Sequence, residues 1–151
     1  MPRSALPPGL TIRELRPEDY DLLVNLWIGA GLPYRPQGRD GRERVVKEIS
    51  SPSCIFLVAE LKGELVGSLL GTSDGRKGWI NRLAVRPDLR RKGVGGALMQ
   101  EIEKRFEGSG LLVFACLIEE ENTASQEFFD EMGYELDPGV LYYSKRKGKD
   151  V

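Results

Sequence analysis

The sequence predicts one α+β domain, in which a mostly antiparallel central sheet contains one parallel pair of strands and is covered by about four helices. The parallel pair is indicated by an apolar run at 79–85, a helical pattern after it, and a second apolar run at 111–118. Two strands joined through a helix pair in parallel, with a right-handed crossover. At 151 residues the chain is long enough for a single domain with its own core, and we expect one domain over 1–151.

The antiparallel part is indicated by two apolar runs, 53–61 and 64–72, which only Lys62-Gly63 separates. Such spacing is typical of a β-hairpin. A turn at 73–75 then leads toward the strand at 79–85, and alternation of apolar and polar residues predicts a first strand at 10–15.

Two helices are expected before the hairpin. The first begins near Pro17, which suits a first helical turn, and ends near Gly29 to Gly31. It is expected to bury Leu22, Leu23, Leu26 and Trp27. The second begins at Asp40, which has capping-box spacing to Glu43. Its expected apolar face is Val45, Val46 and Ile49.

Two further helices and a closing hairpin are expected in the C-terminal half. One helix starts at Val94, because apolar residues recur every four positions up to Phe106. The other starts at Thr123, which has capping-box spacing to Gln126. The hairpin would pair 134–136 with 140–144, and segments 1–9 and 146–151 are expected to be mobile.

Composition excludes several kinds of chemistry. Lys plus Arg is 22 and Asp plus Glu is 23, so the net charge of −1 argues against general nucleic-acid binding. The absence of histidine excludes Ser–His and Cys–His nucleophiles and the usual zinc sites, so no metal is expected. Cys54 and Cys116 are not in a CxxC pair and are expected to be buried free thiols of a cytoplasmic protein. No signal peptide and no membrane span is expected.

An anion site is predicted where the strand at 79–85 feeds a basic, glycine-rich turn that opens a helix. The first N–H groups of a helix have no partner within it, and the helix dipole makes this end positive. Glycines let a phosphate approach those amides closely. The sequence therefore predicts a phosphate or pyrophosphate at 93–97, with attraction from the basic triplet Arg90, Arg91 and Lys92.

Residues 90–95 follow the pattern Arg-x-x-Gly-x-Gly, after Leu83, Ala84 and Val85. This run resembles the acyl-CoA-binding motif of the GNAT superfamily of N-acetyltransferases. A second run, 122–134 (NTASQEFFDEMGY), resembles the superfamily's Asn–small–aromatic–Gly–aromatic signature, and the order of expected elements is that of the GNAT fold. The resemblance covers essentially the whole chain. It implies acetyl-CoA as co-substrate, contacted by Leu83, Ala84, Val85, Arg90, Arg91, Lys92, Gly93, Val94, Gly95, Gly96, Ala97, Asn122, Ser125 and Phe129.

The resemblance implies attack of a neutral amine on the thioester, with a backbone N–H near 83–85 stabilising the oxyanion. In many GNAT enzymes a tyrosine seven residues after the signature Asn acts as the general acid. In this chain the position seven residues after Asn122 is Phe129, which has no hydroxyl. The thiolate could leave with help from water or a backbone amide, another hydroxyl (Tyr142, Tyr143 or Ser125) could substitute, or the protein could catalyse poorly. Glu119 is the candidate base, with Glu120 and Glu121 as alternatives, although all three could simply be solvated.

The acceptor would lie near the irregular segment 31–41, which joins the first two helices and lines the acceptor site in GNAT proteins. Candidate contacts there are Tyr34, Arg35, Arg39 and Asp40, with Asn81 and Arg82 on the adjacent strand. Strand alternation would direct one of the last two into the cleft.

The function expected from these features is transfer of acetyl from acetyl-CoA to a primary amine of a protein or small molecule, in a ternary complex. The alternative is a non-catalytic acyl-CoA sensor. A third hypothesis, nucleic-acid binding by the basic cluster at 86–92, is opposed by the net charge and the lack of interleaved aromatics. The resemblance also allows a homodimer, and the acceptor stays open.

Overall fold

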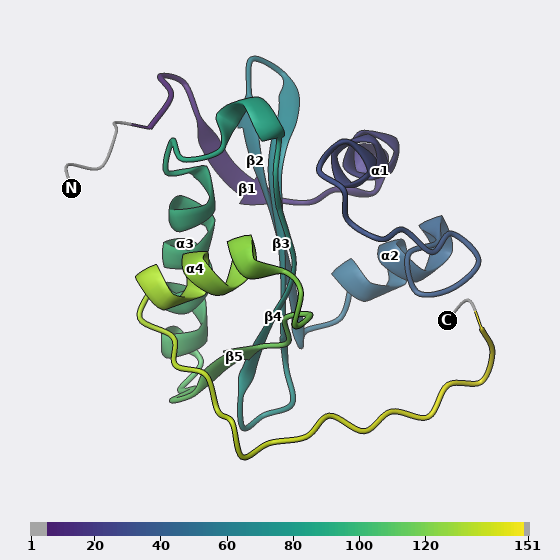
Figure 1. The fold of residues 1–151 in the computed structure, drawn as a ribbon. Helices are drawn as coiled ribbons and strands as arrows, with labels where there is room; N and C mark the ends of the chain where they lie inside the picture. The colour runs from purple at the N-terminus through teal and green to yellow at the C-terminus, as the bar shows by residue number, and fades with distance from the viewer. Residues whose placement is uncertain (1–5, 150–151) are drawn as a thin grey trace.

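A computed structural model describes residues 6–149 and shows five strands in the order β1-β2-β3-β4-β5 (Figure 1). The strands are β1 (Thr11–Glu14), β2 (Cys54–Leu61), β3 (Glu64–Ser73), β4 (Gly78–Val85) and β5 (Phe114–Cys116). Neighbouring strands from β1 to β4 are antiparallel, whereas β4 and β5 are parallel. The predicted α+β class, with a single parallel pair in a mainly antiparallel sheet, is confirmed for the part of the chain described.

Four α-helices cover the sheet in two layers. A 3₁₀ turn at Pro17–Asp19 leads into α1 (Tyr20–Gly29), and α1 and α2 (Arg42–Ile49) lie on one face. A second 3₁₀ turn at Pro87–Leu89 precedes α3 (Val94–Gly108), which lies with α4 (Thr123–Glu131) on the opposite face (Figure 1). The sheet is therefore the middle of three layers, and both of its faces can bury side chains.

Each face of the sheet has its own apolar core. On the α3 side, Leu98, Met99, Ile102 and Phe106 pack on β2, β3 and β4. On the other side, Leu23 and Trp27 of α1 and Val45 of α2 pack on Phe56 and Val58. The helix α3 lies so close to the sheet that a Cβ added at Gly78 would come within 2.4 Å of the Phe106 ring. Glycine at that position allows this close approach.

The ladder between β3 and β4 is interrupted in the middle of β4. Arg82 and Leu83 together oppose the single residue Leu69, which defines a β-bulge. Arg82 also has a left-handed φ of 53°, which non-glycine residues rarely adopt. The flanking pairs are Ser68 with Ala84 and Leu70 with Asn81. Arg82 and Leu83 of β4 therefore have no paired residue in the ladder between β3 and β4.

The predicted closing hairpin is wrong. Among residues 6–149 no strand follows α4, and the chain after Tyr134 runs as an extended segment below the sheet toward the side of α2 (Figure 1). The predicted strand at 111–118 is also shorter, since only Phe114–Cys116 pairs with β4. Apolar runs and the turn Asp137-Pro138-Gly139 indicated strands in this region, but the local sequence does not identify the partner strand that a ladder requires.

Three local expectations also need correction. Leu22 is exposed, because it lies on the outer side of α1, and Val46 and Ile49 are only half-buried. The cap of α2 is Gly41 rather than Asp40, because the Asp40 carboxylate accepts hydrogen bonds from the backbone of Arg35 and from the side chain of Arg82. The cap of α4 is Asn122 rather than Thr123.

Both cysteines are free and half-buried rather than fully buried. No helix among residues 6–149 is both long and apolar enough to cross a bilayer. The expectation of mobile ends falls partly on 1–5 and 150–151, which lie outside the described residues.

Candidate active site

The glycine loop, defined here as residues 90–97, places uncapped helix amides next to open space. Gly93 is the N-cap of α3 with a φ of 82°, and no side chain caps this helix or adds an acidic group to its first turn. Val94 is fully buried and anchors the loop in the core. A Cβ added at Gly96 would meet nothing within 4 Å outside its own helix, so packing does not require glycine there. The loop therefore has the geometry of a phosphate cradle.

Three basic side chains border this cradle. Arg90, Arg91 and Lys92 are all exposed, and Arg90 donates a hydrogen bond to the carbonyl of Ala30 at 3.2 Å. Arg86, by contrast, is held by ion pairs with Asp88 and Glu64. The positive charge that can reach a polyanion at the helix end is therefore concentrated at 90–92.

The β4 bulge lies between the glycine loop and the point where the parallel strands part. The last pair between β4 and β5 is Ile80 with Cys116, so β4 continues past β5 without a neighbour on that side. Ala84 is buried, while Leu83 and Val85 are half-buried beside the α3-side core. Arg82 and Leu83 lie outside the β3–β4 ladder, in the part of β4 that has no β5 neighbour among the described residues. The Arg82 carbonyl accepts a hydrogen bond from the Ser68 hydroxyl at 2.8 Å.

Asn122 and Ser125 lie together at the start of α4. The Asn122 side chain accepts a hydrogen bond from the backbone N–H of Ser125 at 3.1 Å and so caps the helix. The ring of Phe128, on the next turn, would be 3.3 Å from a Cβ at Gly95, which packs α4 against the glycine loop. Phe129 points into the core, edge-on to Tyr134 at 5.1 Å between ring centres.

The candidate acceptor residues form a network centred on Asp40. Arg82 pairs with the buried Asp40 carboxylate, and its guanidinium lies 4.5 Å from the centre of the Trp27 ring. The same carboxylate accepts from the backbone N–H of Arg35 at 2.9 Å. These contacts fasten the segment between α1 and α2 to the β4 bulge. Arg39 is exposed at the edge of this segment.

Two tyrosine hydroxyls extend the network. The Tyr20 hydroxyl donates to the Asp40 carbonyl at 2.6 Å and lies 3.0 Å from the Tyr34 hydroxyl. Burial, and then the contact with Tyr34, raises the pKa of Tyr20 well above its ordinary value. Tyr20 therefore stays protonated at neutral pH and acts here as a hydrogen-bonding group.

Glu48 and Cys54 lie beside this network, and the sequence did not predict a chemical role for either of them. Glu48 of α2 is half-buried, and burial, followed by the charge of Asp40, raises its pKa. Burial raises the pKa of the Cys54 thiol to about 12, so it is not a thiolate nucleophile. Periodicity placed Glu48 on an ordinary helix surface, and only the fold brings it near Asp40 and Arg82.

The remaining catalytic candidates lie on the opening side of the sheet. Glu119 is exposed just after β5, and its backbone carbonyl accepts the N–H of Asn122 at 2.9 Å. A shallow hollow of about 330 Å³ lies between the C-terminal segment and the sheet. It is lined by Thr72, Trp79, Asn81, Leu117, Val140, Leu141 and Tyr142. Tyr142 thus borders the opening together with Asn81, whereas Tyr143 does not line the hollow.

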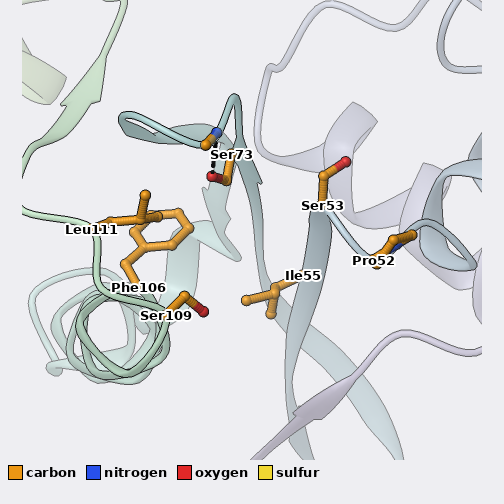
Figure 2. A pocket seen from close by; sticks show the side chains of 8 residues that line it. Pro52, Ser53, Ile55, Ser73, Phe106, Ser109 and Leu111 are labelled. Atoms are coloured by element: carbon orange, nitrogen blue, oxygen red, sulfur yellow. Dashed lines mark hydrogen bonds between the residues drawn. The ribbon is translucent and has the colours of Figure 1, made fainter.

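A second hollow, of about 310 Å³, is separate from these groups (Figure 2). It lies at the far end of α3, between the start of β2 and the end of β3, where Ile55, Phe106 and Leu111 supply apolar walls. The 15 residues of α3 span about 22 Å at ~1.5 Å each, so this hollow is remote from the glycine loop.

Comparison with known proteins identifies the family. The model of the acetyltransferase (GNAT) family matches residues 17–134. Acetyltransferase SG1711 of Sodalis glossinidius (strain morsitans) is 31% identical over 141 residues, covering 93% of this chain and 98% of that protein.

Two solved structures share the fold. PaiA N-acetyltransferase from Thermoplasma acidophilum, in complex with coenzyme A, has a TM-score of 0.76 at 22% identity and covers 87% of this chain and 92% of its own. AAC(6′)-Iy, in complex with the bisubstrate analogue CoA-S-monomethyl-acetylneamine, has a TM-score of 0.76 at 19% identity, with coverage of 91% and 98%. Taken with the match to the family model over most of its length, these findings mean that the chain belongs to the GNAT family and is an acetyl-CoA-dependent acetyltransferase.

Proposed function

We propose that this enzyme transfers the acetyl group of acetyl-CoA to a primary amine in a ternary complex. The observation that carries the proposal is the combination of an uncapped α3 N-terminus with a bulge on the adjacent strand that interrupts its ladder. The first fits the pyrophosphate of the donor, and the second fits the carbonyl oxygen of its thioester.

On the donor side, the amides of 93–97 would bind the pyrophosphate, with Arg90, Arg91 and Lys92 close to its charges. The open space at Gly96 supports this assignment, because a packing role would have filled it. The pantetheine arm would lie along Val85 and the start of α4, with the amide of Asn122 beside it. Ser125 lies on the same turn, whereas Phe129 supports this helix from the core.

In the reaction, the amine nitrogen forms a bond to the acetyl carbon while the carbon–sulfur bond breaks. A backbone N–H of 83–85 would stabilise the negative charge that develops on the acetyl oxygen. Glu119, or water held by it, would accept the proton that the amine loses. The thiolate would take a proton from water or from Tyr142, which borders the opening.

On the acceptor side, an amine would enter between the α1–α2 segment and β4. Tyr34 and the half-buried Glu48 lie there, and a carboxylate in this position favours a cationic or polyamine-like acceptor. Arg35 and Arg82 are engaged with Asp40, so they shape this wall rather than bind an acceptor carboxylate. The complex of AAC(6′)-Iy with an acetylneamine analogue supports a small-molecule amine as the first acceptor class to try.

The two free thiols favour a reducing compartment such as the cytoplasm.

The test is calorimetric titration of acetyl-CoA into three proteins: wild type, Gly96→Glu and Gly108→Glu. Both glycines face open space on α3, but only Gly96 is at the cradle, so Gly96→Glu should lose at least tenfold in affinity while Gly108→Glu should bind as wild type does. Gly95 is less suitable, because any side chain there would push on Phe128. Equal losses in both variants would reject the cradle.

Turnover separates the enzyme from a sensor. The assay measures the release of free thiol from acetyl-CoA when an aminoglycoside, a polyamine or a peptide with a free N-terminus is added as the acceptor. Binding of acetyl-CoA with no acceptor-dependent thiol release from any amine class would favour the sensor, for which the lack of a hydroxyl at Phe129 is the motivating observation.

A further inference from the structure

A fully buried serine of β3 contacts the backbone of the β4 bulge. The Ser68 hydroxyl donates a hydrogen bond to the carbonyl of Arg82 at 2.8 Å and accepts one from the indole N–H of Trp27 in α1 at 3.1 Å. An indole N–H can only donate, so the serine oxygen must accept from Trp27 and turn its own hydrogen toward Arg82. These two hydrogen bonds define the Trp27–Ser68–Arg82 relay, and the donor and acceptor of each are therefore fixed.

Trp27 also contacts the other end of the bulge residue. Its ring lies 4.5 Å from the Arg82 guanidinium, which pairs with Asp40 and donates to the carbonyl of Pro33 at 2.6 Å. The left-handed φ of 53° at Arg82 costs free energy in a residue that has a Cβ. Contacts at both its carbonyl and its guanidinium offset this cost. An apolar residue in place of Ser68 would leave the buried carbonyl and the indole N–H without these partners.

The hydrogen bond from Ser68 also determines where the next backbone N–H points. The peptide between Arg82 and Leu83 is trans and planar, so the Leu83 N–H points opposite to the Arg82 carbonyl. Because this carbonyl points toward Ser68 of β3, the N–H points away from β3, to the side of β4 on which β5 lies. The last pair between those two strands is Ile80 with Cys116, so among residues 6–149 no strand pairs with β4 on that side at Leu83.

We infer that Trp27 and Ser68 are positioning residues for acetyl transfer, which hold the peptide between Arg82 and Leu83 so that its N–H meets the acetyl oxygen of acetyl-CoA. This role rests on the proposed function, in which a backbone N–H of 83–85 stabilises that oxygen. Neither side chain touches the substrate, and both act through the peptide that they orient.

The relay also responds to the charge that develops during the reaction. When an oxygen that gains negative charge accepts from the Leu83 N–H, the peptide is polarised and the Arg82 carbonyl becomes a stronger acceptor. The hydrogen bonds from Ser68 and Trp27 strengthen with it, since hydrogen bonds in a chain polarise one another. The relay therefore stabilises the transition state more than it stabilises bound acetyl-CoA, and its loss should lower kcat rather than affinity.

The first experiment measures the acetyl carbonyl directly, by difference infrared spectroscopy of bound acetyl-CoA that is isotopically labelled at that carbonyl. In wild type the carbonyl stretch should lie at lower frequency than in free acetyl-CoA, because the Leu83 N–H polarises the bond. Ser68→Ala should lose most of this shift and Trp27→Phe part of it, while both keep a Kd for acetyl-CoA within about threefold of wild type. The matched control is Ile102→Val, which trims an equally buried side chain of the α3-side core and should keep the shift. Thermal melts check that each variant is folded.

The second experiment tests whether Trp27 acts through Ser68, with any amine that wild type acetylates. Ser68→Ala should lower kcat by roughly tenfold, which is less than the ~100-fold cost of deleting an oxyanion donor, because the Leu83 amide is still present. Trp27→Phe removes the indole N–H but keeps an aromatic ring, and in the Ser68→Ala background it should cause no further loss. Ser68→Thr retains the hydroxyl and should recover most of kcat.

The possible failures have different signatures. A carbonyl shift in Ser68→Ala as large as in wild type, no shift in wild type that binds acetyl-CoA, or rate losses that add in the double variant would each overturn the relay while leaving acetyl-CoA binding in place. If acetyl-CoA binds but no amine is acetylated, the infrared comparison decides alone, with Trp27→Phe as the second variant. A wild type that binds no acetyl-CoA would overturn the proposed donor site, and the relay with it.

Discussion

Single residues at this site serve the fold and the ligand at once, and Asn122 is the clearest case. Its side-chain oxygen caps α4 through Ser125, while the resemblance to GNAT enzymes assigns its amide to the pantetheine arm. The two roles use different atoms of one side chain, because the oxygen accepts and the NH₂ donates. They can therefore be separated by substitution.

We expect Asn122→Ser to retain the cap and to lose the amide donor. Its thermal unfolding midpoint should stay near that of wild type, whereas the Kd for acetyl-CoA should rise about tenfold. Asn122→Ala should lose both, with a further cost of about 1 kcal/mol in unfolding free energy. Calorimetric binding and thermal melts of the two variants check this. If Asn122→Ser binds acetyl-CoA as tightly as wild type does, the residue is a cap alone.

At the scale of elements, the irregular segment between α1 and α2 is positioned by a long-range ion pair. Asp40 and Arg82 have side chains only 5% and 14% exposed, and Asp40 holds the backbone of Arg35 as well. The segment therefore has a fixed shape despite its glycines and prolines. A buried pair of this kind costs several kcal/mol to break from one side, because the other charge stays buried.

We expect Asp40→Asn to lower the free energy of unfolding by about 3 kcal/mol and to raise the KM for the acceptor more than that for acetyl-CoA. The matched control is Asp21→Asn, which breaks an exposed pair with Arg42 and should cost under about 1 kcal/mol. Urea unfolding and initial rates measure both effects. An acceptor KM unchanged in a destabilised Asp40→Asn variant would show that the pair serves stability alone.

At the scale of the whole molecule, stability against acid depends on a carboxylate that ties the first strand to the first helix. Asp19 is buried and accepts from Arg13 at 2.7 Å and from the backbone of Arg16 at 2.8 Å. The hydrogen bond from Arg13 holds the pKa of Asp19 below its ordinary value. Arg13 also bonds Glu60 of β2, so this cluster joins three elements.

A depressed carboxyl pKa contributes stability that is present above the ordinary pKa of about 3.9 and is lost as pH falls through the lower folded-state value. We therefore expect wild type to lose stability as the pH is lowered below about 4. Asp19→Asn should be less stable at pH 7 by roughly 1.5–3 kcal/mol and should show a flatter decline in acid. Urea unfolding at a series of pH values tests this. Parallel pH profiles for the two proteins would contradict it.

The parts of the molecule that sequence predicted are those specified by neighbours in the chain. The hairpin at Lys62-Gly63, the helix from Val94 and the crossover to β5 all depend on patterns within a few tens of residues. The glycine loop was also predicted, because its basic residues and glycines are consecutive in the sequence. The fold class and the family followed from the order of these local patterns.

The parts that sequence missed depend on distant partners. Asp40 has the spacing of a helix cap, but Arg82, 42 residues away, takes its carboxylate. The bulge at Arg82 could not be predicted, because no glycine marks it in the sequence. Glu48 could not be predicted either, because its position in the helical pattern is that of an ordinary surface residue. Apolar residues on both sides of the turn at 137–139 are typical of a hairpin, but the local sequence cannot say which strand would pair with them.

The β4 bulge also changes which face of the sheet each side chain of this strand occupies. On an uninterrupted strand, residues four apart share a face, but Ile80 belongs to the α3-side core and Ala84 to the α1-side core. The extra residue at the bulge thus shifts the phase of the strand halfway along it. Deleting one residue there would restore a single phase that keeps Ile80, Leu83 and Val85 on one face, so the α3-side core would survive the loss of the bulge. The extra residue in β4 therefore maintains the bulge and is not needed to bury the apolar side chains of this strand on the α3 side.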